Sequence, residues 1–164
     1  MIDHFQKFAL YNQWANSRLY EVTATLTAEE QTRDLGAFFG NILGTLNHIL
    51  VGDLFWMERI EGTGQKPSSL DEILYKTFSE LRIARSASDE RLIRITNTQS
   101  QEDYNSYLDY MTTKGVACHD HKAEVFAHLF NHQTHHRGQC HHMLTQLGKT
   151  LPPLDMIYFF RERE

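Results

Sequence analysis

The sequence predicts an all-α fold, a four-helix bundle, and three observations lead to that prediction. Apolar residues recur mainly three and four positions apart, which is the period of a helix that is buried on one face. Only 3 prolines are present, and two of them are adjacent, at Pro152 and Pro153. Helix-capping residues stand where four long segments would begin or end. With 164 residues, we expect a single domain over residues 1–164 that buries a core without a structural metal.

The first half of the chain predicts two long helices with a capped turn between them. A first helix is expected over about residues 3–24, where the apolar side chains have helical spacing. The segment "TLTAEE" follows, in which Thr27 and Glu30 have the three-residue spacing of a capping box. A second helix is expected over about residues 38–61, and the "GTG" of residues 62–64 should end it.

The second half predicts two more long helices and an irregular connection. The third helix should begin near Ser68 or Ser69, which can cap it, and continue to about residue 95. Residues 101–119 are rich in aromatic and β-branched side chains, so they predict an irregular connection with room for a short hairpin or a crossover. The fourth helix should run from residue 121 or 122 to 147, with Gly148 ending it.

Composition excludes several classes of partner. Lys and Arg number 16 against 21 Asp and Glu, a formal net charge of -5, and no long run of one sign occurs, so nucleic-acid binding is not expected. No apolar stretch approaches the 18 residues that a membrane span requires, and the first residues lack the features of a signal peptide. The two cysteines, Cys118 and Cys140, are then expected to be free, structural thiols in a cytoplasmic protein.

Residues 131–142, "NHQTHHRGQCHH", contain five histidines that a helical wheel divides into two groups. His135 lies on the face opposite the apolar residues, as do two histidines seven positions away on either side, His128 and His142, so these three are expected at the surface. His132 and His136 are four apart at the edge of the apolar face, the spacing at which two imidazoles can bind one metal. An isolated pair of this kind is more often two boundary histidines without a metal, so a third ligand is needed to decide.

His48 is the candidate third ligand, and two glycines flank it. In "NILGTLNHILVGDLFW", Gly44 and Gly52 stand four residues before and after this histidine. A glycine inside a helix costs up to about 1 kcal/mol relative to alanine, so each needs a reason. They could clear space for a bound ligand, or they could let two helices pack closely. Combined with His132 and His136, His48 would complete an open set of three imidazoles, which is typical of catalytic metal sites.

Two charged residues fall on apolar helix faces. Arg137 and Asp53 each lie on the apolar face of their own predicted helix, where an unpaired charge would be costly. Pairing with each other would resolve this. A competing arrangement pairs Arg137 with Asp155 or turns either side chain to solvent.

Four segments resemble the DinB-like family of damage-inducible bacterial proteins, which is grouped with YfiT-like proteins and thiol transferases. They are "LNHILVGDLFW", "NHQTHHRGQ", "YNQWAN" and "LDMIYFFRE", and the likeness extends over nearly the whole chain. The resemblance implies an up-up-down-down four-helix bundle with a long crossover connection, and a divalent metal held by His48, His132 and His136. It also implies a role in stress response, and characterised relatives in the wider superfamily use bacillithiol, mycothiol or glutathione.

We therefore expect a metal-dependent enzyme that activates water or a low-molecular-weight thiol, with Zn2+ or Ni2+ as the cofactor because imidazoles accept several late first-row metals. The partners would be a small-molecule substrate or thiol, and a second copy of the chain, since the apolar end at Tyr158, Phe159 and Phe160 must be covered. A metalloprotease is not expected, because no HExxH motif is present. The alternative is a non-enzymatic stress-response dimer that binds a metal or small ligand.

Overall fold

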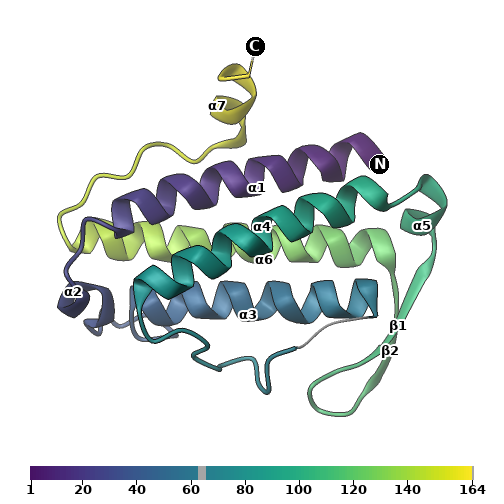
Figure 1. Ribbon diagram of the computed structural model, residues 1–164, viewed down its shortest axis with the longest axis horizontal. Helices are drawn as coiled ribbons and strands as arrows, with labels where there is room; N and C mark the ends of the chain where they lie inside the picture. Colours follow the sequence, from purple (N-terminus) through teal and green to yellow (C-terminus); the bar gives the residue numbers. More distant parts are fainter. Residues whose placement is uncertain (63–65, 164) are drawn as a thin grey trace.

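The computed structural model describes residues 1–62 and 66–163, and it is a bundle of four long helices (Figure 1). These helices are α1 (Ile2–Thr23), α3 (Ile42–Glu61), α4 (Phe78–Thr98) and α6 (Lys122–Gln146). Three short helices accompany them: α2 (Ala28–Thr32), α5 (Gln101–Asn105) and α7 (Met156–Arg161). The strands β1 (Tyr107–Met111) and β2 (Ala117–His121) form one antiparallel hairpin, in which Tyr107 pairs with His121. The predicted all-α, four-helix fold is confirmed.

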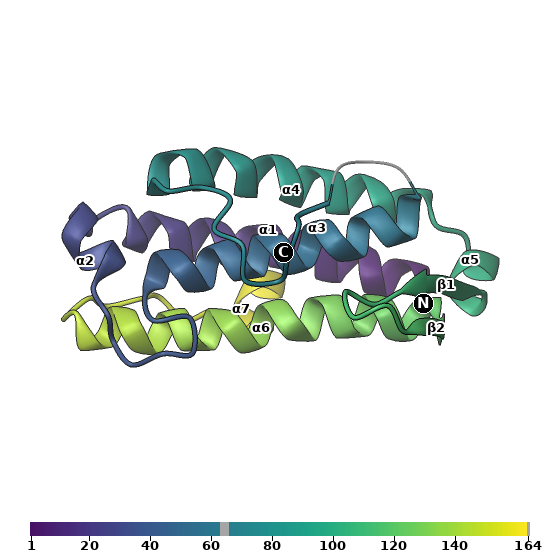
Figure 2. The ribbon, with the colours of Figure 1, turned by 90° about the horizontal axis from the view of Figure 1, so that it is seen from below.

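The four long helices form two parallel and two antiparallel neighbouring pairs. α1 and α3 each pack against both α4 and α6, which leaves α4 and α6 at opposite corners (Figure 2). Figure 1 shows that α1 and α6 run in one direction and that α3 and α4 run in the other. Along the chain the directions are therefore up, down, down, up. The up-up-down-down order implied by the resemblance therefore does not match the structure, in which the parallel pairs are α1 with α6 and α3 with α4.

The predicted start of the bundle agrees with the structure to within a few residues. Thr27 and Glu30 form both bonds of a capping box: the Thr27 hydroxyl accepts from the Glu30 N–H at 3.2 Å, and the Glu30 carboxylate accepts from the Thr27 N–H at 2.8 Å. α3 begins at Ile42 rather than near residue 38, because the Asn41 side chain caps it by accepting from a backbone N–H at 2.8 Å. It ends at Glu61 with the left-handed Gly62, whereas residues 63–64 of the "GTG" motif lie outside the described residues.

The third helix starts later than the sequence predicted. α4 begins at Phe78, with Thr77 as its cap, and not near Ser68. Because α3 and α4 are parallel, the chain between them must return along the bundle, so this is the long crossover, not the connection at 101–119. The buried Asn47 side chain donates to the Tyr75 carbonyl and accepts from the Tyr75 N–H, both at 3.0 Å, which holds the crossover against α3.

The end of the chain contains one helix that the sequence analysis did not identify. The hairpin at residues 107–121 and the end of α6 follow the prediction, including a left-handed Gly148 beyond α6. α7, however, is an additional helix that packs on α1. Its Phe159 ring is buried at 5.9 Å from Tyr11 and 5.8 Å from Trp14, measured between ring centroids. Part of the aromatic end is therefore covered within the chain, while Tyr158 and Phe160 stay exposed.

Two large apolar clusters fill the bundle, and a layer of polar side chains separates them; a third, smaller cluster lies between α1 and α7. One cluster includes Leu19, Leu46 and Leu144, and the other includes Phe5, Met57 and Phe126. Between the two large clusters, all four helices contribute buried polar residues, which we call the polar layer. Its eight members are Asn12, Asn16, Asp53, Arg85, Ser88, Asp89, Gln133 and Arg137. No helix in the described part of the chain has both the length and the apolar character to span a bilayer.

Candidate metal centre

Three imidazoles from two helices converge at the α3–α6 contact. His48 comes from α3, and His132 and His136 come from successive turns of α6. One ring nitrogen of each can be chosen so that all three lie within 4.8 Å of one another, and the Nε2 atoms of His48 and His132 are 3.1 Å apart. Within residues 1–62 and 66–163, this group of potential ligands has no fourth member. The structure thus brings together the three histidines that the sequence analysis selected; we call them the three-histidine cluster.

The two glycines beside His48 make room for different groups. A Cβ atom on Gly52 would lie 2.9 Å from Cε1 of His132, so the missing side chain admits that ring. At Gly44, a Cβ would instead lie 2.5 Å from the Phe39 carbonyl oxygen. The Phe39 ring in turn stacks on His48 at 3.9 Å between centroids. Gly52 therefore borders the cluster, as expected, whereas Gly44 admits the backbone that carries a covering aromatic ring.

Hydrogen bonds at the Nδ1 atoms set the orientation of two of the rings. Nδ1 of His48 lies 2.9 Å from the Leu70 carbonyl oxygen, which can only accept, so this nitrogen is the donor. Nδ1 of His136 likewise donates to the Gln139 side-chain oxygen at 2.7 Å. In each ring the proton at Nδ1 leaves the Nε2 lone pair free. This is the arrangement in which a second partner fixes the tautomer of a metal-binding histidine.

The cluster favours neutral imidazoles. Burial lowers the pKa of His48 and of His136 below the usual value. For His132, burial and then the neighbouring His136 and His48 lower the pKa to about 3. A neutral imidazole is the form that can donate a lone pair to a cation, so the three side chains are ready to bind a metal at neutral pH.

The other histidines of the α6 segment lie outside the cluster. His128, His135 and His142 are exposed, as predicted from the helical wheel, and none belongs to the group of potential ligands. Cys140, one turn beyond His136, is buried, and burial raises the pKa of its thiol to about 12. This thiol stays protonated at neutral pH, which agrees with a structural role.

Asp53 and Arg137 do not pair with each other, which was one of the arrangements that the sequence left open. Asp53 forms an ion pair with Arg85 of α4 and accepts from the Gln133 amide at 2.9 Å. Arg137 does not bond Asp155 either; it donates to the side-chain oxygens of Asn12 and, at 3.2 Å, of Asn16. The sequence analysis missed these partners because it weighed only charged residues. The missed signal was in "YNQWAN", where two asparagines four residues apart lie on the apolar face of the first helix.

The polar layer links every pair of neighbouring helices. Arg85 joins α4 to α3 through Asp53, and it also pairs with Asp89 at 2.9 Å. Asp89 accepts from Asn16 at 2.9 Å, which joins α4 to α1. Gln133 joins α6 to α3, and Arg137 joins α6 to α1. With two arginines and two aspartates, the formal charges of the layer balance, so buried charge is compensated locally.

Comparisons with known proteins agree with this fold. The model of the DinB family matches residues 1–163. Protein DinB of Bacillus subtilis strain 168 is 29% identical over 167 residues, covering 98% of this chain and 96% of that protein, and the uncharacterized protein YizA of the same strain is 23% identical, covering 90% and 97%. A crystal structure of a DinB-like protein from Bacillus cereus ATCC 10987 superposes with a TM-score of 0.67 at 17% identity, covering 92% of this chain and 95% of that one, which shows a shared fold.

Proposed function

The chain belongs to the DinB family, and from that premise we propose that His48, His132 and His136 together bind one divalent metal ion. The observation that carries the proposal is the convergence of three neutral imidazoles, two of which have their Nδ1 protons bound elsewhere. Two Nε2 atoms at 3.1 Å suit a shared cation, because both nitrogens can then offer lone pairs to it. Zn2+ and Ni2+ are the ions that we propose, because both belong to the late first-row metals that imidazole ligands accept.

We further propose that the protein is an enzyme that activates water or a low-molecular-weight thiol, as in thiol transfer. The bound ion would act as a Lewis acid that lowers the pKa of the water or thiol at its open position. Three protein ligands are the usual number in catalytic zinc sites, and the described residues supply three. The chain's own residues orient the imidazoles through Leu70 and Gln139 and cover one side with the Phe39 ring.

A protease-like mechanism does not fit the residues beside the cluster. In an HExxH site, the residue after the first histidine is a glutamate that acts as the general base. Here that residue is Gln133, whose amide nitrogen donates to Asp53 in the polar layer. A carboxamide held away from the cluster in this way cannot accept a proton from water.

Metal analysis of untagged protein tests the proposal, followed by assays of thiol addition to electrophilic substrates with bacillithiol and glutathione. We expect about one divalent ion per chain and metal-dependent consumption of thiol. Metal-free protein that fails to bind added Zn2+ or Ni2+ would refute the metal site. Metal binding without turnover of any thiol or ester substrate would refute the enzyme and leave the binding function.

The second candidate is a non-enzymatic, metal-binding dimer in a stress response. The exposed side chains of Tyr158 and Phe160 favour self-association, because the described residues leave apolar surface on α7 uncovered. Light scattering combined with size-exclusion chromatography gives the oligomeric state. A dimer that forms only when metal is bound would favour this candidate over the enzyme.

A further inference from the structure

A series of aromatic rings leads from the three-histidine cluster along the contact between α3 and α6. The His132 ring lies 5.9 Å from that of His128, one turn earlier on α6, measured between ring centroids. His128 lies 5.2 Å from Trp56 of α3, and Trp56 lies 5.4 Å from Tyr110 of β1. Figure 1 shows the hairpin beside the C-terminal end of α3. His128, Trp56 and Tyr110, which we call the aromatic strip, therefore connect the cluster to the hairpin.

Arg59 lies at the far end of the aromatic strip. Its guanidinium carbon is 4.5 Å from the centre of the Trp56 ring and 4.4 Å from that of Tyr110, and these cation–π contacts hold a side chain that is only partly buried. Within the described part of the chain, Arg59 forms no ion pair, and its one side-chain hydrogen bond is to the Met111 carbonyl oxygen at 3.4 Å. Asp120 instead accepts from the Tyr110 hydroxyl at 2.6 Å. The guanidinium is thus held in place with N–H groups left to bind an anion.

Arg59 is on the same side of α3 as the cluster. It follows His48 by 11 residues, close to three full turns, so the two side chains leave the helix in nearly the same direction. Gly52, which borders the His132 ring, lies between them on this side, seven residues before Arg59. Seven residues rise about 10 Å along a helix axis. A ligand of this length would reach from the cluster, over the aromatic strip, to Arg59.

We propose that Arg59 binds an anionic group of the substrate and thereby selects elongated organic acids. Such a substrate binds the metal at one end, contacts His128 and Trp56 with its body, and places a carboxylate or a phosphate at Arg59. A guanidinium offers paired N–H groups that suit both anions. The inference rests on the proposed metal centre and adds a substrate class to it, because an acid and its neutral ester differ in the contact with Arg59.

Calorimetric titration of the Zn2+-loaded protein tests this inference without requiring turnover. Hydroxamates are the probes, because this group binds zinc directly. Suberic monohydroxamate carries a carboxylate at the far end of its chain, its methyl ester is the neutral counterpart, and the same chain ending in a phosphonate represents phosphate. Acetohydroxamate lacks the chain and reports on the metal centre alone. We expect the acid, the phosphonate or both to bind at least about tenfold more tightly than the ester, the effect of hydrogen bonds to a charged group.

Two substitutions of Arg59 separate its charge from a structural role. Arg59→Met should bring the acid and the ester to within about twofold of each other, and Arg59→Glu should make the acid the weaker ligand. Acetohydroxamate should bind all variants alike. Arg94→Met, at an exposed arginine of α4, is the matched control and should keep the preference for the acid. If Arg59 only joined α3 to the hairpin, its loss would lower the melting temperature and leave that preference unchanged.

The outcomes distinguish this inference from the metal centre on which it rests. Metal-free protein that fails to bind Zn2+ would overturn the metal centre, and the inference with it. Normal binding of Zn2+ and acetohydroxamate, with equal affinities of the wild type for the ester and both anions, would overturn the inference alone. A preference for the acid that survives Arg59→Met would overturn it as well, because another group would then bind the anion.

Discussion

Each imidazole of the three-histidine cluster depends on a neighbour of a different kind. His48 is oriented by a backbone carbonyl of the crossover, and His136 by the Gln139 side chain on its own helix. His132 depends on the absence of a side chain at Gly52. The spacing of the histidines along the sequence predicts which residues meet, but the direction of each ring is set by these neighbours.

Replacing one histidine of the cluster should remove the metal and keep the fold. We expect His132→Ala to lose metal stoichiometry almost completely, because only three ligands are available among the described residues. Helical circular dichroism should be unchanged, since the apolar clusters and not the ion stabilise the bundle. His128→Ala, one turn earlier and exposed, is the control and should retain the metal. Loss of metal from the control instead would show that the ligands lie on the other face of α6.

Adding a methyl group at Gly52 should displace the His132 ring. The new Cβ would lie 2.9 Å from Cε1 of that ring, closer than carbon atoms tolerate, so the ring must move. We expect Gly52→Ala to bind Zn2+ about tenfold more weakly or worse, as measured by competition with a chelator. Gly138→Ala is the matched control on α6, where a Cβ meets nothing within 4 Å. It should stabilise the protein by about 0.5–1 kcal/mol and leave the affinity for Zn2+ unchanged.

The metal-free protein should become less stable as the pH is lowered, and part of this loss should depend on His132. Its pKa is about 3 in the folded protein and about 6.5 in an unfolded chain, so between these values the unfolded state binds more protons. The free energy of unfolding from this group therefore decreases as the pH falls below about 6.5. Burial raises the pKa of Asp53 to about 6, which acts in the opposite direction between about pH 6 and its usual pKa.

Comparing the wild type with His132→Ala separates the contribution of His132 to this pH dependence from that of Asp53. Urea denaturation of wild-type and His132→Ala protein, both metal-free, should be measured at pH 7 and pH 5. We expect the wild type to lose more stability than the variant over this interval. An equal loss in the two proteins would show that His132 is not held neutral by the fold.

At the scale of elements, the crossover before α4 should be coupled to the metal centre through Asn47. This buried side chain holds Tyr75, and the adjacent His48 is bonded to the Leu70 carbonyl. Asn47→Ala leaves the backbone groups of Tyr75 without these partners, so we expect a loss of about 1–3 kcal/mol in urea denaturation. Metal affinity should also fall, because the Leu70 carbonyl is no longer fixed beside His48.

An exposed asparagine provides the control for that substitution. Asn105→Ala, at the end of α5, removes only a surface hydrogen bond to Gln101 and should change stability by less than about 0.5 kcal/mol. If Asn47→Ala weakened the fold but left metal affinity unchanged, the crossover would stabilise the bundle without positioning His48.

Helix boundaries could be predicted where the signals are local. The predictions were wrong where residues distant in the sequence determine the boundary. Thr27 and Glu30 form the predicted capping box because both partners lie within four residues. Ser68 and Glu72 form a similar local pair, with the Ser68 N–H donating at 2.6 Å, yet no helix begins there. Asn47, more than twenty residues earlier, bonds the backbone of Tyr75, where the chain has no regular secondary structure. Sequence periodicity contains no information about such a contact.

At the scale of the whole molecule, the same distinction separates the three-histidine cluster from the polar layer. The cluster could be predicted because two ligands share one helix face and the candidate third ligand lies one turn from a glycine, Gly52, that borders the cluster. The partners of Asp53 and Arg137 could not: Arg85, which pairs with Asp53, belongs to a helix whose start was placed too early, and Arg137 bonds two uncharged asparagines of α1 that were not considered as partners. A charged residue on an apolar helix face predicts that a partner exists, but the packing of all four helices determines which residue that partner is.

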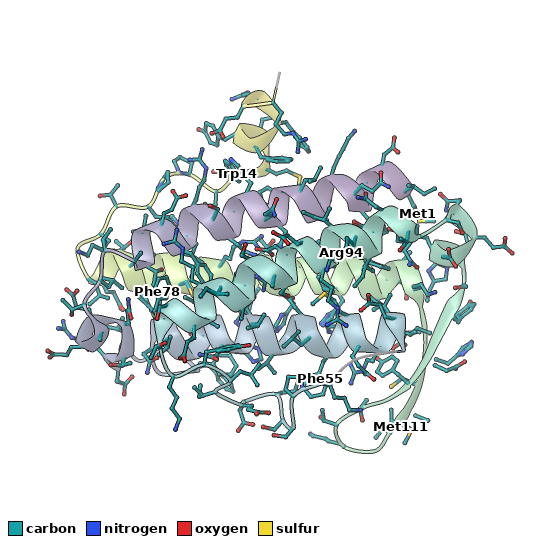
Figure 3. The ribbon with its side chains drawn as sticks, viewed as in Figure 1. Met1, Trp14, Phe55, Phe78, Arg94 and Met111 are labelled. Carbon is teal, nitrogen blue, oxygen red and sulfur yellow. The ribbon has the colours of Figure 1, made fainter. Side chains whose placement is uncertain are left out.

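The polar layer leads to a prediction about the stability of the entire bundle. Arg85 is the one guanidinium of the layer that is ion-paired to both Asp53 and Asp89. Arg85→Met would leave two buried carboxylates without that cation, so we expect a loss of about 3–5 kcal/mol in the free energy of unfolding. Arg94→Met, on the exposed face of the same helix (Figure 3), is the control and should change stability by less than about 0.5 kcal/mol.

A second substitution separates lost charge compensation from lost packing. Adding Asp53→Asn to Arg85→Met removes one of the uncompensated charges, while the new carboxamide oxygen can still accept from Gln133. If uncompensated charge causes the loss, the double variant should be more stable than Arg85→Met alone in urea denaturation. A double variant that is less stable than the single one would show that Arg85 acts mainly by filling space between α3, α4 and α1, because removing the charge that it neutralises would then bring no benefit.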